Sequence, residues 1–413
     1  MSVATLVPRR PWKDRRVVLG VTGGISAYKS VQVARDLTRL GAAVDVVLTA
    51  AAQKFVAPMS FQGVTGRPVL TDLFSSQGGA LHIRLGREAD VVCVAPATAD
   101  FLARAAHGRA DDLICTTLLA TRAPVVVCPA MNDRMFSHPQ VQANLAHLRD
   151  VIGYHVAGPG EGVLAVGEGE GPGRMLEPWQ IEEHVGRALG SDDALREQRV
   201  LVTAGPTREP IDPVRYVGNR SSGRMGYALA QAAWRRGARV TLVSGPSSLP
   251  APEGVEIVRV ETAVEMHDAV AARLAQADVS IFAAAVADFR PDAVHDAKVK
   301  RAAHAGGLAL TLTANPDVAG DTRATRKAGS VSVGFALETE DVLANALAKL
   351  HAKGFDLLVA NDATAEGSGF DVDTNRVTLL ASGREPEALP LLPKDEVAEV
   401  VLDRVAELLG GGA

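Results

Sequence analysis

The amino-acid sequence predicts an α/β protein built of two doubly wound, mostly parallel-sheet, Rossmann-like domains. Its 413 residues favour two or more domains, each large enough for a core of its own. Two stretches, RLGAAVDVVLT at 39–49 and RRGARVTLVSG at 235–245, repeat one pattern of helix end, glycine and apolar strand. Two such βαβ units predict two parallel sheets, each with its own switch point. One repeat of this kind can also arise by convergence on a common fold.

The first half begins with a predicted strand over Val17–Val21, a helix over about Ser26–Leu40 and a strand over Val44–Thr49. Apolar residues recur along the helix at spacings of three and four, which indicates one buried face. Further strands are predicted at Val91–Ala95 and Val125–Cys128. Both are apolar throughout, as is typical of parallel strands covered on both faces.

The second half repeats this order with a strand over Val200–Thr203, a helix over about Gly223–Arg236 and a strand over Val240–Val243. The stretch Val294–Thr313 is rich in Lys, His and Gly, and we expect a hairpin excursion or a loop that becomes ordered on binding. Four more strands are predicted at Ile257–Val260, Val279–Ala283, Val331–Phe335 and Leu357–Ala360.

Changes in composition suggest the domain boundaries. We expect a disordered leader at 1–15, a first domain at 16–189, a polar linker at 190–198 and a second domain at 199–413. The glycine-rich stretch Gly158–Gly173 is interpreted as a mobile flap or a linker.

Composition also argues against several classes of protein. A net charge of −5 disfavours a general nucleic-acid binder, which is usually basic. No apolar run approaches the roughly 18 residues that a membrane-spanning helix needs. Three cysteines are too few for a disulfide framework and are interpreted as small buried side chains in a reducing compartment. We therefore expect a cytoplasmic enzyme with small-molecule substrates and with no nucleic-acid or membrane partner.

Four loops of the first half follow predicted strand ends and carry residues suited to ligand binding. They are Gly23–Ser26, the end of a strand at Thr49, Pro96–Ala99, and Pro129–Asn132 with Met135 three residues on. Because the carboxyl ends of parallel strands meet at one edge of the sheet, we expect these loops to form one site. No single loop is specific, since a Gly-Gly turn is most often only a turn.

His82 is flanked by apolar residues. Taken alone, it is interpreted as a structural histidine more readily than as a catalytic one. Asn132 follows a strand and a proline, and is the better polar candidate.

The first half resembles the flavin-dependent cysteine decarboxylases. It is most similar to the decarboxylase half of the bifunctional phosphopantothenoylcysteine decarboxylase/phosphopantothenate–cysteine ligase family of coenzyme A biosynthesis. The resemblance covers about residues 16–185 and rests on the motifs HI, PATA and PAMNxxM. It implies a flavodoxin-like domain in which FMN oxidises the thiol-bearing carbon of the substrate so that CO₂ can leave. By this resemblance, Gly24, Ile25, Ser26, Thr49, Ala97 and Thr98 hold FMN, His82 is the catalytic base, Asn132 holds the substrate carboxylate, and Met135 contacts the substrate.

One position departs from the family pattern. The flap reads LAVGEGEGPGRM, and Val166 stands where the family usually has a cysteine. Because valine cannot donate a proton, the final protonation must have another source, and Glu168, Glu170 or water are the candidates.

The second half carries an unusually long polar loop between its first strand and helix, VLVTAGPTREPIDPVRYVGNRSSGRMG at 200–226. Backbone N–H groups at a helix N-terminus favour phosphates. Neither GxGxxG nor GxxxxGK[ST] occurs in the chain, so the loop is neither a dinucleotide fingerprint nor a Walker A motif. Several lysines nearby suggest a nucleoside-triphosphate site, although any one of them is more often merely a solvated surface residue.

This half closely resembles the ligase half of the same family over about residues 199–385, on the motifs AAAVADFRP, KVKR, NPDV, VGFALETE and LLVANDA. The resemblance implies that CTP activates the carboxylate of 4′-phosphopantothenate as an acyl-cytidylate, which the amine of L-cysteine then attacks. It also implies Mg²⁺, without assigning its ligands. By this resemblance, CTP is bound by Asp288, Lys298, Pro316, Asp317, Val318, Ala319, Phe335, Lys349 and Lys353, Lys298 also completes the chemistry, and Arg215, Asn219 and Ala285 handle phosphopantothenate and its acyl-cytidylate.

Two other classes of function stay open at this point. A tandem oxidoreductase using NAD(P) would need the missing GxGxxG and an acidic residue where Thr49 stands. A regulatory nucleotide-binding module without catalysis is supported only by Val166. The family resemblance further implies a homo-oligomer, expected to be a dodecamer of decarboxylase trimers and ligase dimers, with His82 at a subunit interface.

Overall fold

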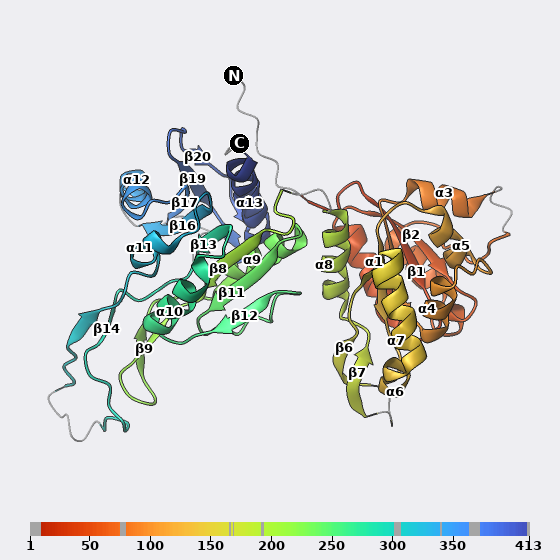
Figure 1. Cartoon of the computed structure of the whole chain (residues 1–413), viewed down its shortest axis with the longest axis horizontal. Helices are drawn as coiled ribbons and strands as arrows, with labels where there is room; N and C mark the ends of the chain where they lie inside the picture. The colour runs from red at the N-terminus through yellow and green to blue at the C-terminus, as the bar shows by residue number, and fades with distance from the viewer. Residues whose placement is uncertain are drawn as a thin grey trace. The chain divides into compact units, whose positions relative to one another are not determined.

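The structure, a computed structural model, describes residues 10–74, 80–164, 167, 169–190, 194–300, 307–338, 341–362 and 372–410. Two compact units divide the chain, residues 10–191 and 192–413. Each has a central parallel sheet with helices on both faces (Figure 1). The predicted α/β fold class with two doubly wound sheets is therefore confirmed.

The N-terminal unit is built on a five-stranded, all-parallel sheet of order β2-β1-β3-β4-β5. This order is that of flavodoxin-like folds, whose ligand binds at the switch point between the first and third strands. A separate antiparallel hairpin, β6–β7, lies within the predicted glycine-rich flap. The strands are β1 (Arg16–Val21), β2 (Ala43–Leu48), β3 (Val91–Ala97), β4 (Val125–Pro129), β5 (His155–Val156), β6 (Gly160–Val163) and β7 (Glu170–Arg174).

Helices cover both faces of this sheet because the side chains of a strand point alternately to its two sides. Val17 and Leu19 of β1 pack toward one face with α1, α2 and α8. Val18 packs toward the other face with α3, α4, α5 and α7. The helices are α1 (Ala27–Arg39), α2 (Pro58–Thr65), α3 (Leu81–Glu88), α4 (Ala99–Ala106), α5 (Leu113–Ala120), α6 (Asp133–Ser137), α7 (Pro139–Ala146) and α8 (Pro178–Leu189), with single turns η1 (Ala52–Lys54) and η2 (His147–Ile152).

The predicted leader is wrong for the part of it that the structure describes. Trp12 is only 8% exposed and packs in the core of the N-terminal unit. Its indole Nε1 donates a hydrogen bond of 3.1 Å to the carbonyl of Glu182 in α8. Residues 10–15 are therefore part of the folded unit, since burial of a large aromatic side chain stabilises this segment. Residues 1–9 lie outside the described part of the chain.

The C-terminal unit is built on an eight-stranded sheet of order β12-β11-β8-β13-β16-β17-β19-β20. Its six strands from β12 to β17 are parallel, and β19 and β20 extend the edge antiparallel. In chain order the parallel part reads 3-2-1-4-5-6, the Rossmann arrangement, with its switch point between β8 and β13. The strands of the sheet are β8 (Arg199–Ala204), β11 (Arg239–Ser244), β12 (Glu256–Arg259), β13 (Val279–Phe282), β16 (Val331–Glu338), β17 (Leu357–Asp362), β19 (Val377–Ala381) and β20 (Glu387–Ala388).

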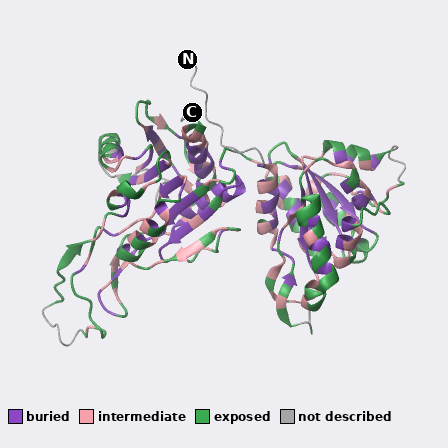
Figure 2. Ribbon diagram, viewed as in Figure 1, coloured by how far each residue is buried: buried purple, intermediate pink, exposed green. Residues whose placement is uncertain are grey.

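Two helices, α9 and α13, cover one face of this sheet, and α10, α11 and α12 cover the other. The carboxylate of Glu399 in α13 joins Arg235 and Arg236 at the end of α9 through ion pairs of 2.7 and 2.6 Å, and all three side chains are buried. Buried residues (purple in Figure 2) concentrate on the strands and on the helix faces that meet them. The helices are α9 (Arg224–Arg235), α10 (Ala263–Leu274), α11 (Val318–Asp321), α12 (Val342–Lys353) and α13 (Lys394–Gly410), with the turn η4 (Arg323–Thr325).

An arm extends from the C-terminal unit where the sequence predicts a hairpin excursion. Its base is the antiparallel pair β14–β15, and a second small pair, β9–β10, lies beside it (Figure 1). Residues 301–306 of the arm lie outside the described residues. The remaining short strands are β9 (Arg208–Pro210), β10 (Tyr216–Gly218), β14 (Phe289–Pro291), β15 (Leu312–Ala314), β18 (Thr374–Asn375) and β21 (Leu392–Pro393). Among the described residues, no helix has the length and apolar character to cross a membrane.

Candidate functional site

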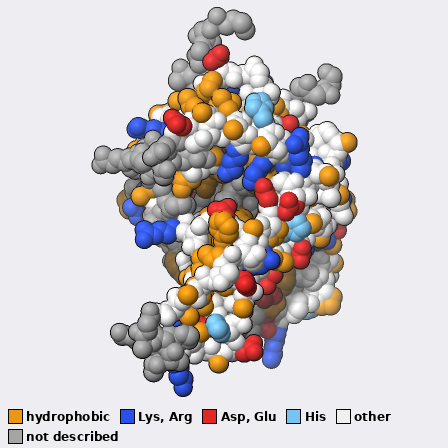
Figure 3. Space-filling view, turned by 90° about the vertical axis from the view of Figure 1, so that its left-hand side faces the viewer, with side chains coloured by type: hydrophobic (Ala, Val, Ile, Leu, Met, Phe, Trp, Pro, Cys, Tyr) orange, Lys and Arg blue, Asp and Glu red, His pale blue; other side chains and the backbone are white. Residues whose placement is uncertain are grey.

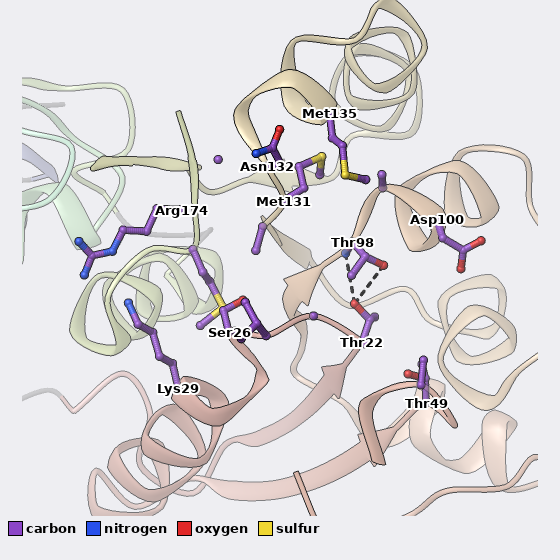
Figure 4. A pocket seen from close by; sticks show the side chains of 18 of the residues that line it. Thr22, Ser26, Lys29, Thr49, Thr98, Asp100, Met131, Asn132, Met135 and Arg174 are labelled. Carbon is purple, nitrogen blue, oxygen red and sulfur yellow. Dashed lines mark hydrogen bonds between the residues drawn. The ribbon is translucent and has the colours of Figure 1, made fainter. Parts of the chain in front are cut away.

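A cavity of about 920 Å³ opens at the carboxyl edge of the N-terminal sheet (Figure 4). It lies over the switch point between β1 and β3, which is where this fold binds ligands. Its volume falls within the roughly 300–1,000 Å³ that small-molecule sites occupy. All four predicted loops contribute to its lining, so the expectation that they meet at one site is met by the geometry.

Thr22 joins the two loops of the switch point. Its hydroxyl donates a hydrogen bond of 2.7 Å to the carbonyl of Pro96 and accepts one of 3.1 Å from the backbone N–H of Thr98. Figure 4 shows these two threonines facing one another. The loops after β1 and β3 are thereby held as one rigid floor.

Gly23 and Gly24 shape this floor in different ways. A side-chain carbon added at Gly23 would lie 2.4 Å from the Cβ of Ala51, so only glycine permits the close approach of these two loops. A carbon added at Gly24 would meet nothing closer than 3.5 Å. The three atoms within 4 Å, in Thr98, Pro96 and Ser26, lie at ordinary van der Waals distances, so Gly24 lines the cavity without a close approach of this kind.

Two helices begin at the cavity, and each carries a hydroxyl at its N-cap. Ser26 precedes α1, and its side chain makes no capping hydrogen bond. Thr98 precedes α4 and accepts a hydrogen bond of 3.4 Å from the N–H of Phe101. Free N–H groups and the positive ends of helix dipoles favour an anion at such positions. This donor set fits the phosphate of a flavin nucleotide.

The loop after β4 forms another wall and carries Asn132. Oδ1 of Asn132 caps α6 by accepting a hydrogen bond of 3.0 Å from the N–H of Arg134. Because Oδ1 is occupied in this way, the amide nitrogen is the group that Asn132 can offer to a ligand. Met135, on the first turn of α6, also lines the cavity.

The hairpin β6–β7 closes one side of the cavity, with Val163, Leu164 and Gly173 in the lining. A side-chain carbon at Gly173 would lie 2.2 Å from the carbonyl oxygen of Met131. The N–H of Met131 donates a hydrogen bond of 2.9 Å to the carbonyl of Gly173. The predicted flap is therefore packed against the loop of Asn132. It belongs to the N-terminal unit and is not a linker between units.

Two cations in the lining were not predicted from the sequence. Lys29 of α1 donates a hydrogen bond of 2.8 Å to Glu177, and Arg174 of β7 contacts the same carboxylate. Burial raises the pKa of Glu177, but the hydrogen bond from Lys29 and the charge of Arg174 outweigh this and hold it below its ordinary value. The sequence held only a weak signal for each of these residues. Lys29 lies in the first turns of a predicted helix, and Arg174 directly follows the predicted flap.

A cluster of three acidic residues at the rim is paired with Arg104. Its guanidinium binds Asp100 at 3.1 Å, Asp111 at 3.2 Å and Asp112 at 2.5 Å. Asp111, Asp112 and Cys115 lie close enough together to suggest a metal site. Burial, however, raises the pKa of Cys115 to about 12, so its thiol stays protonated, and the two carboxylates already bind Arg104. This trio is better explained as a structural ion-pair cluster.

The cavity brings together most, but not all, of the residues predicted for the first reaction. Gly24, Ile25, Ser26, Thr49, Thr98, Asn132 and Met135 line it. Ala97 is fully buried at the end of β3, directly before Thr98. His82 lies on α3 and is not part of the described lining.

The proton-donor candidates are only partly described. Glu170 begins β7 and is exposed. Val166 and Glu168 lie outside the described residues.

The second predicted site lies at the switch point of the C-terminal unit. The loop after β8 and the loop after β13 meet there, since the N–H of Ala285 donates a hydrogen bond of 2.9 Å to the carbonyl of Gly205. Nδ2 of Asn219 donates one of 2.8 Å to the carbonyl of Val286. Arg215 contacts the carbonyl of Val299, in the segment that carries Lys298. Four of the predicted ligase residues, or their direct neighbours, are thus joined at one edge of the sheet.

The residues predicted to bind the nucleotide form a second group beside this edge. The N–H of Asn315, directly before Pro316, donates a hydrogen bond of 2.9 Å to the carbonyl of Asp288. Asp317 caps α11, whose first residues are Val318 and Ala319, and pairs with Lys353 of α12 at 3.0 Å. Burial raises the pKa of Asp317, but its hydrogen bond from the Gly320 N–H and its pairing with Lys353 hold it below the ordinary value.

The remaining predicted residues lie on separate elements. Phe335 is part of β16 and pairs with Val359 of β17. Lys349 lies on α12, one turn before Lys353. Lys298 is exposed in the arm, and its side chain makes no hydrogen bond or ion pair with any residue that the structure describes.

Comparison with known proteins places both halves of the chain. The family described as Flavoprotein matches residues 7–189, and the family described as DNA/pantothenate metabolism flavoprotein C-terminal domain matches residues 195–409. The chain is 44% identical over 398 residues to the coenzyme A biosynthesis bifunctional protein CoaBC of Vibrio vulnificus (strain CMCP6), covering 96% of this chain and 98% of that protein.

Two further similarities extend this comparison. The chain is 45% identical over 411 residues to the CoaBC protein of Mycobacterium tuberculosis (strain ATCC 25618 / H37Rv), with coverages of 96% and 97%. Among solved structures, the C-terminal domain of a coenzyme A biosynthesis bifunctional protein CoaBC covers 53% of this chain and all of that domain, at 39% identity and a TM-score of 0.46.

Proposed function

Because the chain belongs to the CoaBC family of bifunctional coenzyme A biosynthesis proteins, we propose which of its residues carry the two activities of that family. The chain is a bifunctional enzyme with a flavoprotein phosphopantothenoylcysteine decarboxylase domain and a phosphopantothenate–cysteine ligase domain. The family expected from the sequence motifs is confirmed. The roles of individual residues and the identity of the nucleotide as CTP are proposals.

For the decarboxylase, FMN occupies the cavity over the β1/β3 switch point. The observation that carries this assignment is the convergence of the N-termini of α1 and α4 on the cavity, where Gly24 and Ser26 are part of the lining and the Ser26 side chain makes no capping hydrogen bond. Thr98 supports the same anion from the second loop. The flavin, when bound, supplies the oxidation of the substrate carbon that makes loss of CO₂ possible.

The chain itself binds and orients the substrate beside the flavin. Nδ2 of Asn132 donates to the substrate carboxylate, because Oδ1 is held by the cap of α6. Met135, 49% exposed in the lining, covers the apolar part of the substrate. His82 serves as the base in a neighbouring copy of the chain, which accounts for its place outside the cavity of its own copy.

For the ligase, 4′-phosphopantothenate and CTP react at the β8/β13 switch point. A carboxylate must be activated before an amine can replace its oxygen. The carboxylate of 4′-phosphopantothenate attacks the α-phosphate of CTP and releases pyrophosphate, which gives the acyl-cytidylate. The amine of cysteine then displaces CMP from it. Arg215, Asn219 and Ala285 hold the phosphopantothenate arm, and the group of Asp288, Pro316–Ala319, Phe335, Lys349 and Lys353 holds CTP. Lys298, whose ammonium has no partner among the described residues, offsets the charge that develops on the phosphates, together with Mg²⁺.

We also propose that the enzyme is a cytoplasmic homo-oligomer, with decarboxylase trimers and ligase dimers joined in a dodecamer. The arm supports self-association, because Leu308, Leu310 and Leu312 alternate along it and are 37%, 38% and 44% exposed. Phe289 and Val294 are each 55% exposed nearby. Figure 3, which looks onto this end of the C-terminal unit, shows hydrophobic side chains exposed among charged ones. Apolar surface of this kind usually marks a protein interface.

The experiment that tests the ligase proposal compares Lys298→Gln with the wild type in two assays. Pyrophosphate release with phosphopantothenate, cysteine and CTP should fall by at least a hundredfold, because the variant loses one charge opposite the phosphates (about 3 kcal/mol). Decarboxylation of supplied phosphopantothenoylcysteine should be unchanged. Unaltered pyrophosphate release would show that Lys298 does not take part.

A further inference from the structure

Asp212 is a buried carboxylate in the loop between β9 and β10, and neither proposed reaction uses it directly. It is 2% exposed. Its Oδ1 accepts hydrogen bonds of 2.8 and 2.9 Å from the N–H groups of Val214 and Arg215. Its Oδ2 accepts one of 3.1 Å from the N–H of Val299 and lies 3.4 Å from Nε of Arg215. The two oxygens therefore have different tasks: one closes the turn at 212–215, and the other reaches the arm.

The arm is held at this point by both backbone polar groups of a single residue, Val299. While Asp212 accepts from the N–H of Val299, the guanidinium of Arg215 donates to the carbonyl of Val299. Three residues earlier than Lys298, the N–H of His295 donates a hydrogen bond of 2.9 Å to the carbonyl of Ile211. Three hydrogen bonds thus join the segment 292–300 to residues 211–215, the loop that carries Arg215.

These ties fix the backbone next to Lys298 and leave its side chain free. Val299 is partly buried, whereas Lys298 and Lys300 on either side of it are exposed. Burial raises the pKa of Asp212, but the three backbone N–H groups and Arg215 outweigh this and hold it below its ordinary value. The carboxylate is therefore ionised at neutral pH and keeps its strong, charge-assisted hydrogen bonds.

We propose that Asp212 is a positioning residue of the ligase: its Oδ2 holds the Val299 amide so that Lys298 is presented to the substrate that Arg215 binds. This inference rests on the roles proposed above for Lys298 and Arg215. A turn residue with no such role would need only Oδ1. Oδ2, however, accepts a hydrogen bond from Val299, 87 residues away in the sequence. This contact favours a positioning role over that of a simple turn residue.

Asp212→Asn separates the two tasks with a change of one atom. The single oxygen of asparagine can still accept from Val214 and Arg215, while the amide group that replaces Oδ2 is a donor facing the donor of Val299. We expect kcat of ligation to fall by about tenfold to a hundredfold, as for loss of a hydrogen bond to a charged group that orders a reacting side chain. The KM for 4′-phosphopantothenate should change less than threefold, since the turn that carries Arg215 is kept.

Two controls accompany this variant in the full-length chain. Asp292→Asn removes the same charge from the exposed arm, where Asp292 is hydrogen-bonded to other described residues through its backbone only, and should leave ligation unchanged. Decarboxylation of supplied phosphopantothenoylcysteine, measured in the same preparation of each variant, reports whether the protein remains folded and holds its flavin.

A double-mutant cycle with Lys298→Gln tests whether Asp212 acts through Lys298. If it does, Asp212→Asn should slow ligation by less than twofold in the Lys298→Gln background, because the group that it positions is already gone. An effect of full size in both backgrounds, or a wild-type rate of ligation in Asp212→Asn, would overturn the inference. If the wild type itself does not ligate with CTP, or if Lys298→Gln alone has no effect, the proposed function fails instead.

Amide hydrogen exchange tests the contact between Asp212 and Val299 in the wild-type chain, so this test does not depend on whether a variant folds. The Val299 amide should exchange at least tenfold more slowly than the amides of the exposed residues at 293, 294 and 296–298, because it alone in that segment is held by a buried carboxylate. Exchange as fast as that of these neighbours would show that the tether does not exist in solution and would refute the proposal.

Discussion

Replacing each of the two glycines after β1 by alanine should separate packing from flavin binding. Both substitutions add the same single carbon at adjacent positions, and neither glycine has a left-handed backbone. At Gly23 the new carbon would lie 2.4 Å from the Cβ of Ala51 and 3.0 Å from its carbonyl carbon. At Gly24 the nearest atom is Cγ2 of Thr98 at 3.5 Å, an ordinary contact.

The expected magnitudes follow from these distances. In Gly23→Ala the loops after β1 and β2 must separate by about 1 Å, and overpacking of this kind costs about 1–3 kcal/mol. For a unit of this size, that loss lowers the unfolding temperature by roughly 2–12 °C. In Gly24→Ala the apoprotein should unfold within about 1 °C of the wild type. The added methyl group, however, would lie beside Thr98 and Ser26 in the lining of the cavity, and FMN should bind at least tenfold more weakly.

The assay is thermal unfolding of the flavin-free protein together with fluorescence titration by FMN. Unchanged FMN affinity in Gly24→Ala would refute the placement of the flavin over this loop. An unchanged unfolding temperature in Gly23→Ala would refute the account of the close approach to Ala51. The two results are independent, so either part of the reasoning can fail alone.

Three further predictions concern other parts of the chain. Burial and the neighbouring His184 lower the pKa of His155 to about 4, so it stays neutral in the folded unit while the unfolded chain takes up a proton. The free energy of unfolding of the N-terminal unit should therefore fall by about 3 kcal/mol between pH 6.5 and 4, and His155→Gln should flatten that dependence in denaturant titrations. Burial and the nearby carboxylate of Asp36 raise the pKa of Glu182 to about 8, so this group destabilises the folded unit increasingly as pH rises from 4.5 to 8. Glu182→Gln should accordingly raise the unfolding temperature at pH 8 and not at pH 4.5, and an equal gain at both pH values would contradict this reasoning. Asn132→Ala should lower decarboxylation by at least tenfold without releasing FMN, since it removes the amide donor but none of the groups that line the flavin's phosphate, as absorbance at visible wavelengths and product analysis would show.

The sequence predicts the two sheets well because their strands have a simple physical cause. Parallel strands covered on both faces must be apolar throughout, so β1 and β8 are visible as short hydrophobic runs. The helices that follow these strands, α1 and α9, carry apolar residues at helical spacing, and a glycine follows each of the two helices. Gly41 and Gly237, both with a positive φ, end the two corresponding helices.

Other features depend on contacts between distant residues, which no local pattern encodes. Trp12 lies in a stretch rich in arginine and proline, and its burial in the core and its hydrogen bond to α8 show that it belongs to the folded unit. The glycine-rich flap has the composition of a linker, yet Gly173 is needed there because the backbone of Met131 lies against it.

The functional residues divide in the same way. The loop motifs predict Ser26, Thr98 and Asn132 because strand ends meet at one edge of a parallel sheet. Lys29 was not predicted, because its position in a helical pattern does not reveal its pairing with Glu177, 148 residues away. His82, which the family resemblance names as the catalytic base, lies outside the lining of its own chain's cavity, and the proposal that it acts in a neighbouring copy accounts for this.

The most direct test of the whole account is a single incubation of the purified chain with 4′-phosphopantothenate, L-cysteine, CTP and Mg²⁺, followed by mass spectrometry of the products. We expect a protein with the visible absorption of bound flavin that releases CMP and forms 4′-phosphopantetheine in equal amounts. No CMP should appear when cysteine or phosphopantothenate is left out. A colourless protein that forms no phosphopantetheine, even when phosphopantothenoylcysteine is supplied, would contradict the assignment of the N-terminal cavity and with it the central claim.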